Sequence, residues 1–180
     1  MDDPKFWVCK QNPRANTDQN QMRDLNISQG VLTMPYAHLG EERNNVVDGK
    51  YNKDGNGQEQ DFDKKMKEGD YVVISYTGDI IKPCVLAQVT SPVIYLIDTG
   101  KYYKIDESKN ITLHDTSDNG GIPFRPIGRR IRIIEENVIF PDKRQLGMQF
   151  KTLQHIIMNY RDDKPDNYNL CRNIIRELIR

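Results

Sequence analysis

Five short runs rich in β-branched and aromatic residues lie between residues 71 and 140, and they constrain the fold more than any other feature of the chain. In order, the runs are YVVISY, CVLAQVTS, VIYLID, YYKI and GRRIRIIEENVIF. Turn-forming residues separate several of them, for example at Thr77-Gly78-Asp79 and Thr99-Gly100. Residues of this kind favour strands, and consecutive short strands are typical of a meander or a small barrel.

The last run also alternates, with Arg130 and Arg132 separated by Ile131 and followed by Ile133. A period of two predicts a strand with one buried and one exposed face. At the other end of the chain, FWVCK predicts a first strand, and the polar stretch before Gly30 is compatible with one short helix. Residues 61–67 predict a short charged helix that enters the first of the five runs through a turn at Glu68-Gly69-Asp70.

Beyond Pro141 the apolar spacing changes to a period near 3.6. This spacing predicts two amphipathic helices that form a hairpin. The apolar positions are Leu146, Phe150, Leu153, Ile157 and Tyr160 in the first helix, and Leu170, Ile174, Ile175, Leu178 and Ile179 in the second. We therefore expect an α+β fold in which residues 1–140 form a barrel domain with peripheral helices and residues 141–180 form a helical extension packed on it.

The common catalytic and metal-binding patterns do not occur in the chain. The chain has no GxSxG, Walker loop, HExxH or GxGxxG, so hydrolase, NTPase and dehydrogenase chemistry of the usual kinds is unsupported. The three cysteines and three histidines are widely spaced and form no paired ligand pattern. We expect neither an enzyme, nor a metal, nor a cofactor.

Charge and hydropathy restrict the partners and the compartment. Lysine plus arginine equals aspartate plus glutamate at 26 each, so any nucleic-acid binding must depend on local basic patches. No apolar run reaches the roughly 18 residues that span a bilayer, and the start MDDPKFW lacks the features of a secretory signal. With an odd number of unpaired-looking cysteines, these observations predict a cytoplasmic protein without a membrane partner.

Four segments together resemble a known family. FWVCKQNP is followed by GVLTMP, then by MKEGDYVVISYTGDIIKPCVLAQVTS, and finally by GRRIRIIEEN. This arrangement is similar to the EVE and YTH branches of the PUA-like superfamily over roughly residues 5–140. The resemblance implies a small PUA-like β-barrel that binds nucleic acid and holds a modified base, such as N6-methyladenine or a modified cytosine, in an aromatic pocket.

The resemblance also implies which residues form the pocket. Lys10, Asn12 and the Gly30–Thr33 segment look like their YTH counterparts, but Leu32 stands where that pattern has its first cage tryptophan. Stacking faces must therefore come from other aromatic residues. The expected modified-base pocket comprises Trp7, Lys10, Asn12, Thr33, Tyr36, Tyr76 and Tyr95. The alternative is that the aromatic residues pack the core and rim of the barrel, and that Asn12 belongs to an Asn-Pro turn.

Arginines near the expected strand ends supply a possible phosphate-binding patch. These residues are Arg14, Arg125, Arg129, Arg130 and Arg132, with Lys10 beside them. The alternative is an ordinary solvated face.

Three functions remain open from the sequence. The first is a reader of a modified base in DNA or RNA, whose partners include other domains or subunits of a restriction or RNA-processing system. The second is a protein-interaction adaptor that docks a partner through the C-terminal helices, which exposed Leu and Ile on those helices would favour. The third is an enzyme that uses Glu41, Glu42 and Asp48 in the polar stretch 40–61.

Overall fold

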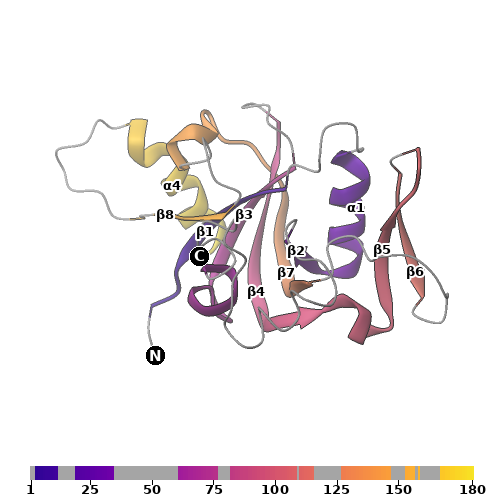
Figure 1. The fold of residues 1–180 in the computed structure, drawn as a ribbon. Coiled ribbons are helices and arrows are strands. Elements are labelled where there is room, and N and C mark those ends of the chain that lie inside the picture. Colours follow the sequence, from indigo (N-terminus) through magenta and orange to yellow (C-terminus); the bar gives the residue numbers. More distant parts are fainter. Residues whose placement is uncertain are drawn as a thin grey trace.

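The computed structural model describes residues 3–11, 19–34, 61–76, 82–108, 110–115, 127–146, 153–156, 158 and 167–180. The fold is α+β, as expected, with one six-stranded sheet, one two-stranded sheet and two α-helices in the described part of the chain (Figure 1). The strands are β1 (Phe6–Lys10), β2 (Val31–Thr33), β3 (Tyr71–Ser75), β4 (Cys84–Tyr95), β5 (Lys101–Ile105), β6 (Ile111–Asp115), β7 (Ile127–Val138) and β8 (Leu153–Ile156). The helices are α1 (Gln19–Gln29) and α4 (Asn167–Leu178), with a π-helix at Asp61–Lys65 and 3₁₀ helices at Leu96–Thr99 and Lys143–Leu146.

The large sheet has the strand order β2-β7-β4-β3-β1-β8. Only the β1–β3 pair is parallel, with Trp7 opposite Val72, and the other neighbours are antiparallel. A parallel pair requires a long crossover, and here the chain between β1 and β3 includes α1 and β2. The strands β5 and β6 form a separate antiparallel hairpin beside α1, where Ile111 N donates to Gln21 Oε1 at 2.9 Å (Figure 1).

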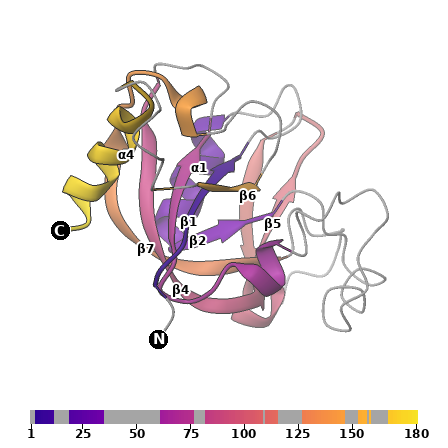
Figure 2. The same cartoon turned by 90° about the vertical axis from the view of Figure 1, so that its left-hand side faces the viewer.

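The two faces of the large sheet carry two separate cores. Trp7 and Cys9 of β1 pack with Met22 of α1 on one face, which we call the inner face. Val8, between them, packs on the outer face with Ile175 of α4. This alternation follows from the period of two along a strand, and it repeats along β3 and β4. Both faces are therefore covered, the inner by α1 and the outer by α4 (Figure 2).

The large sheet curls without closing into a barrel in the described residues. Its edge strands are β2 and β8, and no ladder joins them in this part of the chain. The curl nevertheless brings β2 to the end of β1, although three strands separate them in the sheet. Gln11 bridges the gap, because its side-chain Nε2 donates to Thr33 O at 2.6 Å while its backbone N donates to Ser75 O at 2.7 Å. Figure 2 shows how strongly β4 and β7 bend around the inner face.

The C-terminal expectation is half correct. The second predicted helix is present as α4, but the helical hairpin is wrong, because Leu153–Ile156 form β8 instead of part of a first helix. β8 pairs antiparallel with β1 and hydrogen-bonds the otherwise open edge of that strand. Pairing of this kind satisfies backbone groups that a local helix would leave exposed on β1, so tertiary context overrides the helical spacing.

Two further differences concern strands. The run Ile111–Asp115, inside a stretch that looks polar, forms β6. The runs CVLAQVTS and VIYLID are not separate strands, because β4 continues to Tyr95 through an irregularity between Val89 and Val93. The turn before β3 is confirmed, with Gly69 at φ 93°, a backbone conformation that glycine adopts at no steric cost. No helix in the described ranges is long and apolar enough to cross a bilayer.

Candidate functional site

The ends of β1, β2 and β3 meet at one end of the curled sheet, and buried polar side chains gather there. We call this group the strand-end cluster; it comprises Gln11, Asn26, Thr33, Tyr76 and Tyr103. Asn26 joins two tyrosines, because its Nδ2 donates to Tyr76 Oη and its Oδ1 accepts from Tyr103 Oη, each at 3.2 Å. Amides and hydroxyls are the groups that read the edges of nucleobases, but here they bond chiefly to one another.

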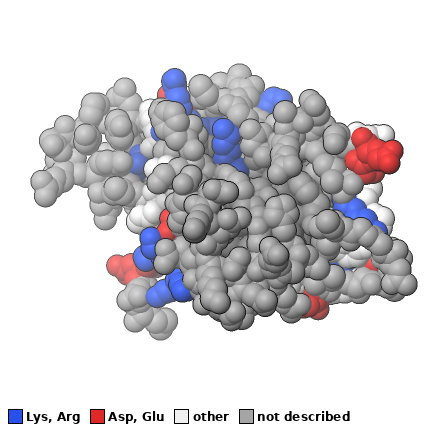
Figure 3. Space-filling view, in the orientation of Figure 1, with Lys and Arg blue, Asp and Glu red and all other residues white. Residues whose placement is uncertain are grey.

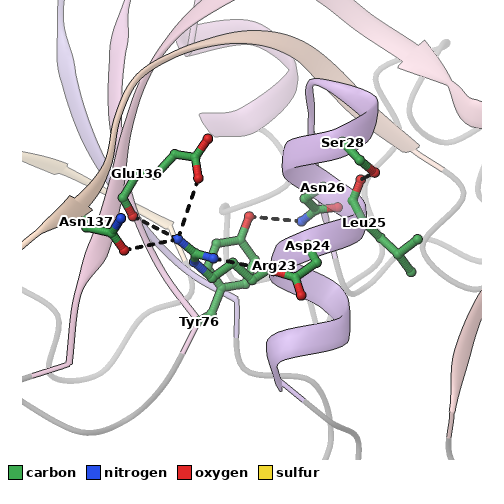
Figure 4. Close-up of polar contacts among 8 residues, drawn as sticks. All are labelled: Arg23, Asp24, Leu25, Asn26, Ser28, Tyr76, Glu136 and Asn137. Carbon is green, nitrogen blue, oxygen red and sulfur yellow. Dashed lines mark hydrogen bonds and ion pairs between the residues drawn. The ribbon is translucent and has the colours of Figure 1, made fainter.

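Helix α1 is held over this cluster by the half-buried side chain of Arg23, which also lies 4.0 Å from the Glu136 carboxylate. Arg23 donates to Glu136 O at 3.1 Å and to Asn137 Oδ1 at 3.3 Å, near the end of β7. Figure 4 shows this anchor next to the Asn26–Tyr76 hydrogen bond. Because Asn26 lies less than one helical turn from Arg23, the anchor helps to fix the position of the amide against Tyr76.

The structure brings together some of the expected pocket residues and separates others. Thr33 and Tyr76 both belong to the strand-end cluster, and Lys10 is half-buried at the end of β1 beside it. Tyr95 is half-buried on β4, two strands away from Thr33. Asn12 and Tyr36 lie outside the described residues.

Trp7 lies at the opposite end of β1, in the core. It is 2% exposed, and its Nε1 donates to Asp70 Oδ2 at 2.8 Å. The same carboxylate accepts from Lys67 N at 2.9 Å and from Lys5 N at 2.8 Å. The indole is thus a core residue fastened to the turn before β3, as the packing alternative expects, and it is not available to stack on a base in this structure.

Arg129 is a correction to the expected phosphate-binding patch. Its guanidinium is buried and donates to three carbonyl oxygens: Phe62 O at 2.6 and 2.9 Å, Asp63 O at 2.8 Å and Ser91 O at 2.9 Å. Burial lowers the pKa of this guanidinium, while the carboxylates of Asp63 and Asp70 oppose the shift. With its donors turned to the protein, Arg129 fastens the π-helix to β4 and β7 and has none directed to a phosphate.

The other arginines of the expected patch have different surroundings. Arg130 and Arg132 are exposed on β7, and Arg132 donates to Gln88 Oε1 at 2.7 Å. Arg14 and Arg125 lie outside the described residues. On the face shown in Figure 3, the basic and acidic side chains of the described residues form small separate groups, with no continuous basic stripe among them.

Arg130 lines a cavity of about 190 Å³ between the end of α1, the strands β2 and β7, and the β5–β6 hairpin. The remaining lining residues are Gln29, Val31, Leu96, Thr99, Lys101, Tyr103 and Leu113. Lys101, Gln29 and Thr99 were missed by sequence reasoning, since each stands in a polar surface context without a motif. The only sequence signal for Lys101 is its position directly after the turn glycine Gly100.

Metal and nucleophile chemistry find little support in the described part of the chain. No group of three or more His, Cys, Asp or Glu residues there could hold a metal ion. Cys9, Cys84 and Cys171 form no disulfide and are buried, and burial raises the pKa of the Cys84 thiol to about 11. A thiol of that pKa is a poor nucleophile near neutral pH. Glu41, Glu42 and Asp48 lie outside the described residues.

Comparison with known proteins does not identify a family. No protein family matches the chain, and no curated protein matches it. Among solved structures, a hypothetical protein from Leishmania major resembles it, with a TM-score of 0.42 and 11% sequence identity over 98% of this chain and 96% of that one. The likeness to EVE and YTH domains therefore stays a prediction.

Proposed function

We propose that the chain is a nucleic-acid-binding module of the PUA-like kind that accepts a modified base at the end of the sheet where β1, β2 and β3 terminate. Binding, with no bond broken, is its role in this proposal. The base is N6-methyladenine or a modified cytosine, and the module serves a larger restriction or RNA-processing system.

One observation supports this proposal more than any other: Gln11 ties the ends of β1, β2 and β3 together. Gln11 contacts Thr33 O and Ser75 O, and Ser75 directly precedes Tyr76. Lys10 and Asn12 flank Gln11 in the sequence, and Tyr36 is the third residue after Thr33; Asn12 and Tyr36 lie outside the described residues. Four of the seven expected pocket residues, Lys10, Asn12, Thr33 and Tyr76, thus belong to the strand-end cluster or adjoin it in sequence.

A flipped base would need a stacking face as well as polar contacts. The ring of Tyr76 is buried, with 2% of the residue exposed, so we propose Tyr36 as the stacking face. Trp7 no longer belongs in the proposed pocket, because its indole is fastened to Asp70.

The test is a titration of the protein with labelled single- and double-stranded DNA and RNA, with and without N6-methyladenine or 5-methylcytosine, followed by fluorescence anisotropy at near-physiological salt. We expect one modified oligonucleotide to bind more tightly than its unmodified form. Tyr36→Ala should weaken that binding roughly tenfold, because stacking contributes about 1 to 3 kcal/mol per base.

Tyr71→Ala is the matched control, because Tyr71 lies at the opposite end of β3 from Tyr76 and stacks on Phe6 with ring centroids 5.2 Å apart. A melting curve for each variant separates loss of binding from loss of folding. Equal affinity for modified and unmodified oligonucleotides would contradict the proposal.

A second candidate function, the protein-interaction adaptor, is favoured by the surface of α4. Leu170 and Leu178 on this helix are 45% and 36% exposed. Ile139 is 63% exposed, and its neighbours Val138 and Phe140 belong to the same core as Ile175 of α4. Exposed apolar side chains of this size are typical of protein contacts when they are contiguous. The oligonucleotide titration separates the two candidates, since an adaptor of this kind binds none of the oligonucleotides.

A further inference from the structure

The cavity beside Arg130 is assembled from six parts of the chain. Gln29 ends α1, Val31 begins β2, Leu96 and Thr99 come from a 3₁₀ helix, and Arg130 lies on β7. The hairpin completes it with Lys101 and Tyr103 from β5 and Leu113 from β6. Figure 1 shows this hairpin standing beside α1, at the end of the molecule away from α4.

The lining divides into an apolar floor and a polar rim. Val31, Leu96 and Tyr103 are buried, whereas Lys101 and Arg130 are exposed at the opening. No carboxylate is among the lining residues. Two cations around one small hollow attract an anion, and the low-dielectric floor beneath them strengthens that attraction.

Neither cation forms an ion pair within the described part of the chain. Other basic residues there do form such pairs, including Lys65 with Asp61 at 2.7 Å and Arg144 with Asp142 at 2.8 Å. Asp115 stands opposite Lys101 in the β5–β6 ladder but forms no ion pair with it, and it is not among the lining residues of the cavity. A bound anion would neutralise the two cations at the opening.

The backbone holds both cations on rigid elements. Arg130 N donates to Ser91 Oγ at 2.8 Å, and Arg130 pairs with Val31 across the β7–β2 ladder. Lys101 follows Gly100, whose φ of 85° favours glycine, and Thr99 Oγ1 closes the preceding turn by donating to Leu96 O at 2.6 Å. These contacts fix the two backbone positions from which the exposed side chains of Lys101 and Arg130 extend.

We propose that this cavity binds a phosphate group of the phosphomonoester or orthophosphate class. An arginine offers a planar pair of donors and a lysine a point charge, and two cations match the charge of about −1.5 to −2 that such a group carries near neutral pH. Gln29 adds an amide donor. The volume is below the roughly 300 Å³ at which drug-sized ligand pockets begin, which suits one compact group.

This inference is independent of the proposed modified-base pocket, because it uses none of the residues in the strand-end cluster except the buried ring of Tyr103. It is tested by isothermal titration of the protein with inorganic phosphate, with a nucleoside 5′-monophosphate, and with one oligonucleotide carrying either a 5′-phosphate or a 5′-hydroxyl. We expect saturable binding of at least one phosphate-bearing ligand.

Arg130→Met and Lys101→Met should each weaken that binding about tenfold or more, since each removes a charge-assisted hydrogen bond. Lys82→Met is the control, because it removes an exposed cation that belongs neither to the lining nor to the expected phosphate-binding patch, and it should leave the affinity unchanged. Both cations are exposed, so their loss should not prevent folding.

The ligands distinguish the source of the phosphate. A preference for the 5′-phosphorylated oligonucleotide that Arg130→Met abolishes indicates a nucleic-acid terminus, whereas equal affinity for inorganic phosphate indicates a free anion. No saturable binding of any ligand, or binding that survives both substitutions, overturns the inference. If Arg130→Met loses phosphate binding but keeps a preference for a modified base, the cavity and the modified-base pocket are distinct sites.

Discussion

Arg129 and Arg130 are neighbours on β7, yet they have opposite surroundings. Arg129 is 2% exposed and its guanidinium is bonded to three carbonyl oxygens, while Arg130 is exposed at the mouth of a cavity. Successive side chains of a strand point to opposite sides, so one residue of displacement separates a structural role from a surface role. Consecutive arginines at a strand end therefore do not form a single phosphate-binding patch.

The largest effect should come from the buried member of this pair. Arg129→Met leaves the buried carbonyl oxygens of Phe62 and Ser91 and the partly buried one of Asp63 without this donor, and we expect it to lower the free energy of unfolding by roughly 3 kcal/mol. Arg130→Met should change it by less than about 0.5 kcal/mol, as is usual at exposed positions. Urea titration followed by tryptophan fluorescence measures both, because Trp7 is the single tryptophan of the chain. Equal losses for the two variants would remove the distinction drawn here.

Sequence reasoning could anticipate part of this contrast. The alternation that places Ile131 and Ile133 on a buried face also places Arg129 on that face, because the three positions are two residues apart. The sequence pattern alone therefore favours burial of Arg129. The alternating pattern does not predict what the buried guanidinium binds, because Phe62 O and Asp63 O come from a segment more than 60 residues away. The cavity was equally hidden, because its lining comes from six elements whose proximity only the tertiary fold creates.

For the fold, the β-rich runs located most of the strands, whereas the amphipathic spacing predicted α4 correctly and the helix before it wrongly. β1, β3, β5 and β7 coincide with the predicted runs, and α1 and α4 are helices as expected. β8 was mistaken for a helix because Leu153 fits a helical stripe, whereas its actual partner is β1 at the other end of the sequence. A local sequence pattern cannot predict pairing between strands so far apart in the sequence.

Asp70, in the turn before β3, is a second buried charged residue whose side chain is bonded within the protein, as Arg129 is. In Asp70→Asn an amide NH2 replaces one of the two carboxylate oxygens. In one orientation it faces the donors Trp7 Nε1 and Lys67 N, and in the other it faces Lys5 N, so a donor meets a donor either way. We expect a loss of roughly 2 kcal/mol in unfolding free energy, and an altered emission of Trp7, whose Nε1 loses a charged acceptor. Glu68→Gln, in the same turn but exposed, serves as the control and should melt like the parent. A normal melting curve for Asp70→Asn would show that the carboxylate is dispensable.

The smallest effect concerns His155 on β8, whose ring lies edge-on to Trp7 with centroids 5.3 Å apart. Burial lowers the pKa of this imidazole, and the charge of Lys5 lowers it further. The unfolded chain, with a pKa near 6.5, therefore binds the proton more readily, so stability present above about pH 6.5 declines as the pH falls toward the lower folded value. His155→Gln should flatten the dependence of the melting temperature on pH between 8 and 5. An unchanged slope would assign the dependence to other groups.

The position of β1 has a consequence for how the chain reaches its folded state. β1 is paired on one side with β3 and on the other with β8, so the first described strand lies between strands that begin 65 and 147 residues later. During synthesis this apolar segment must remain unpaired until residue 75 is available on one side and residue 156 on the other. Pairings that distant in sequence slow folding and lengthen the time for which a strand edge is exposed to other chains. We therefore expect the pairing of β1 with β3, which requires far less of the chain than its pairing with β8, to form first and to shorten this exposure.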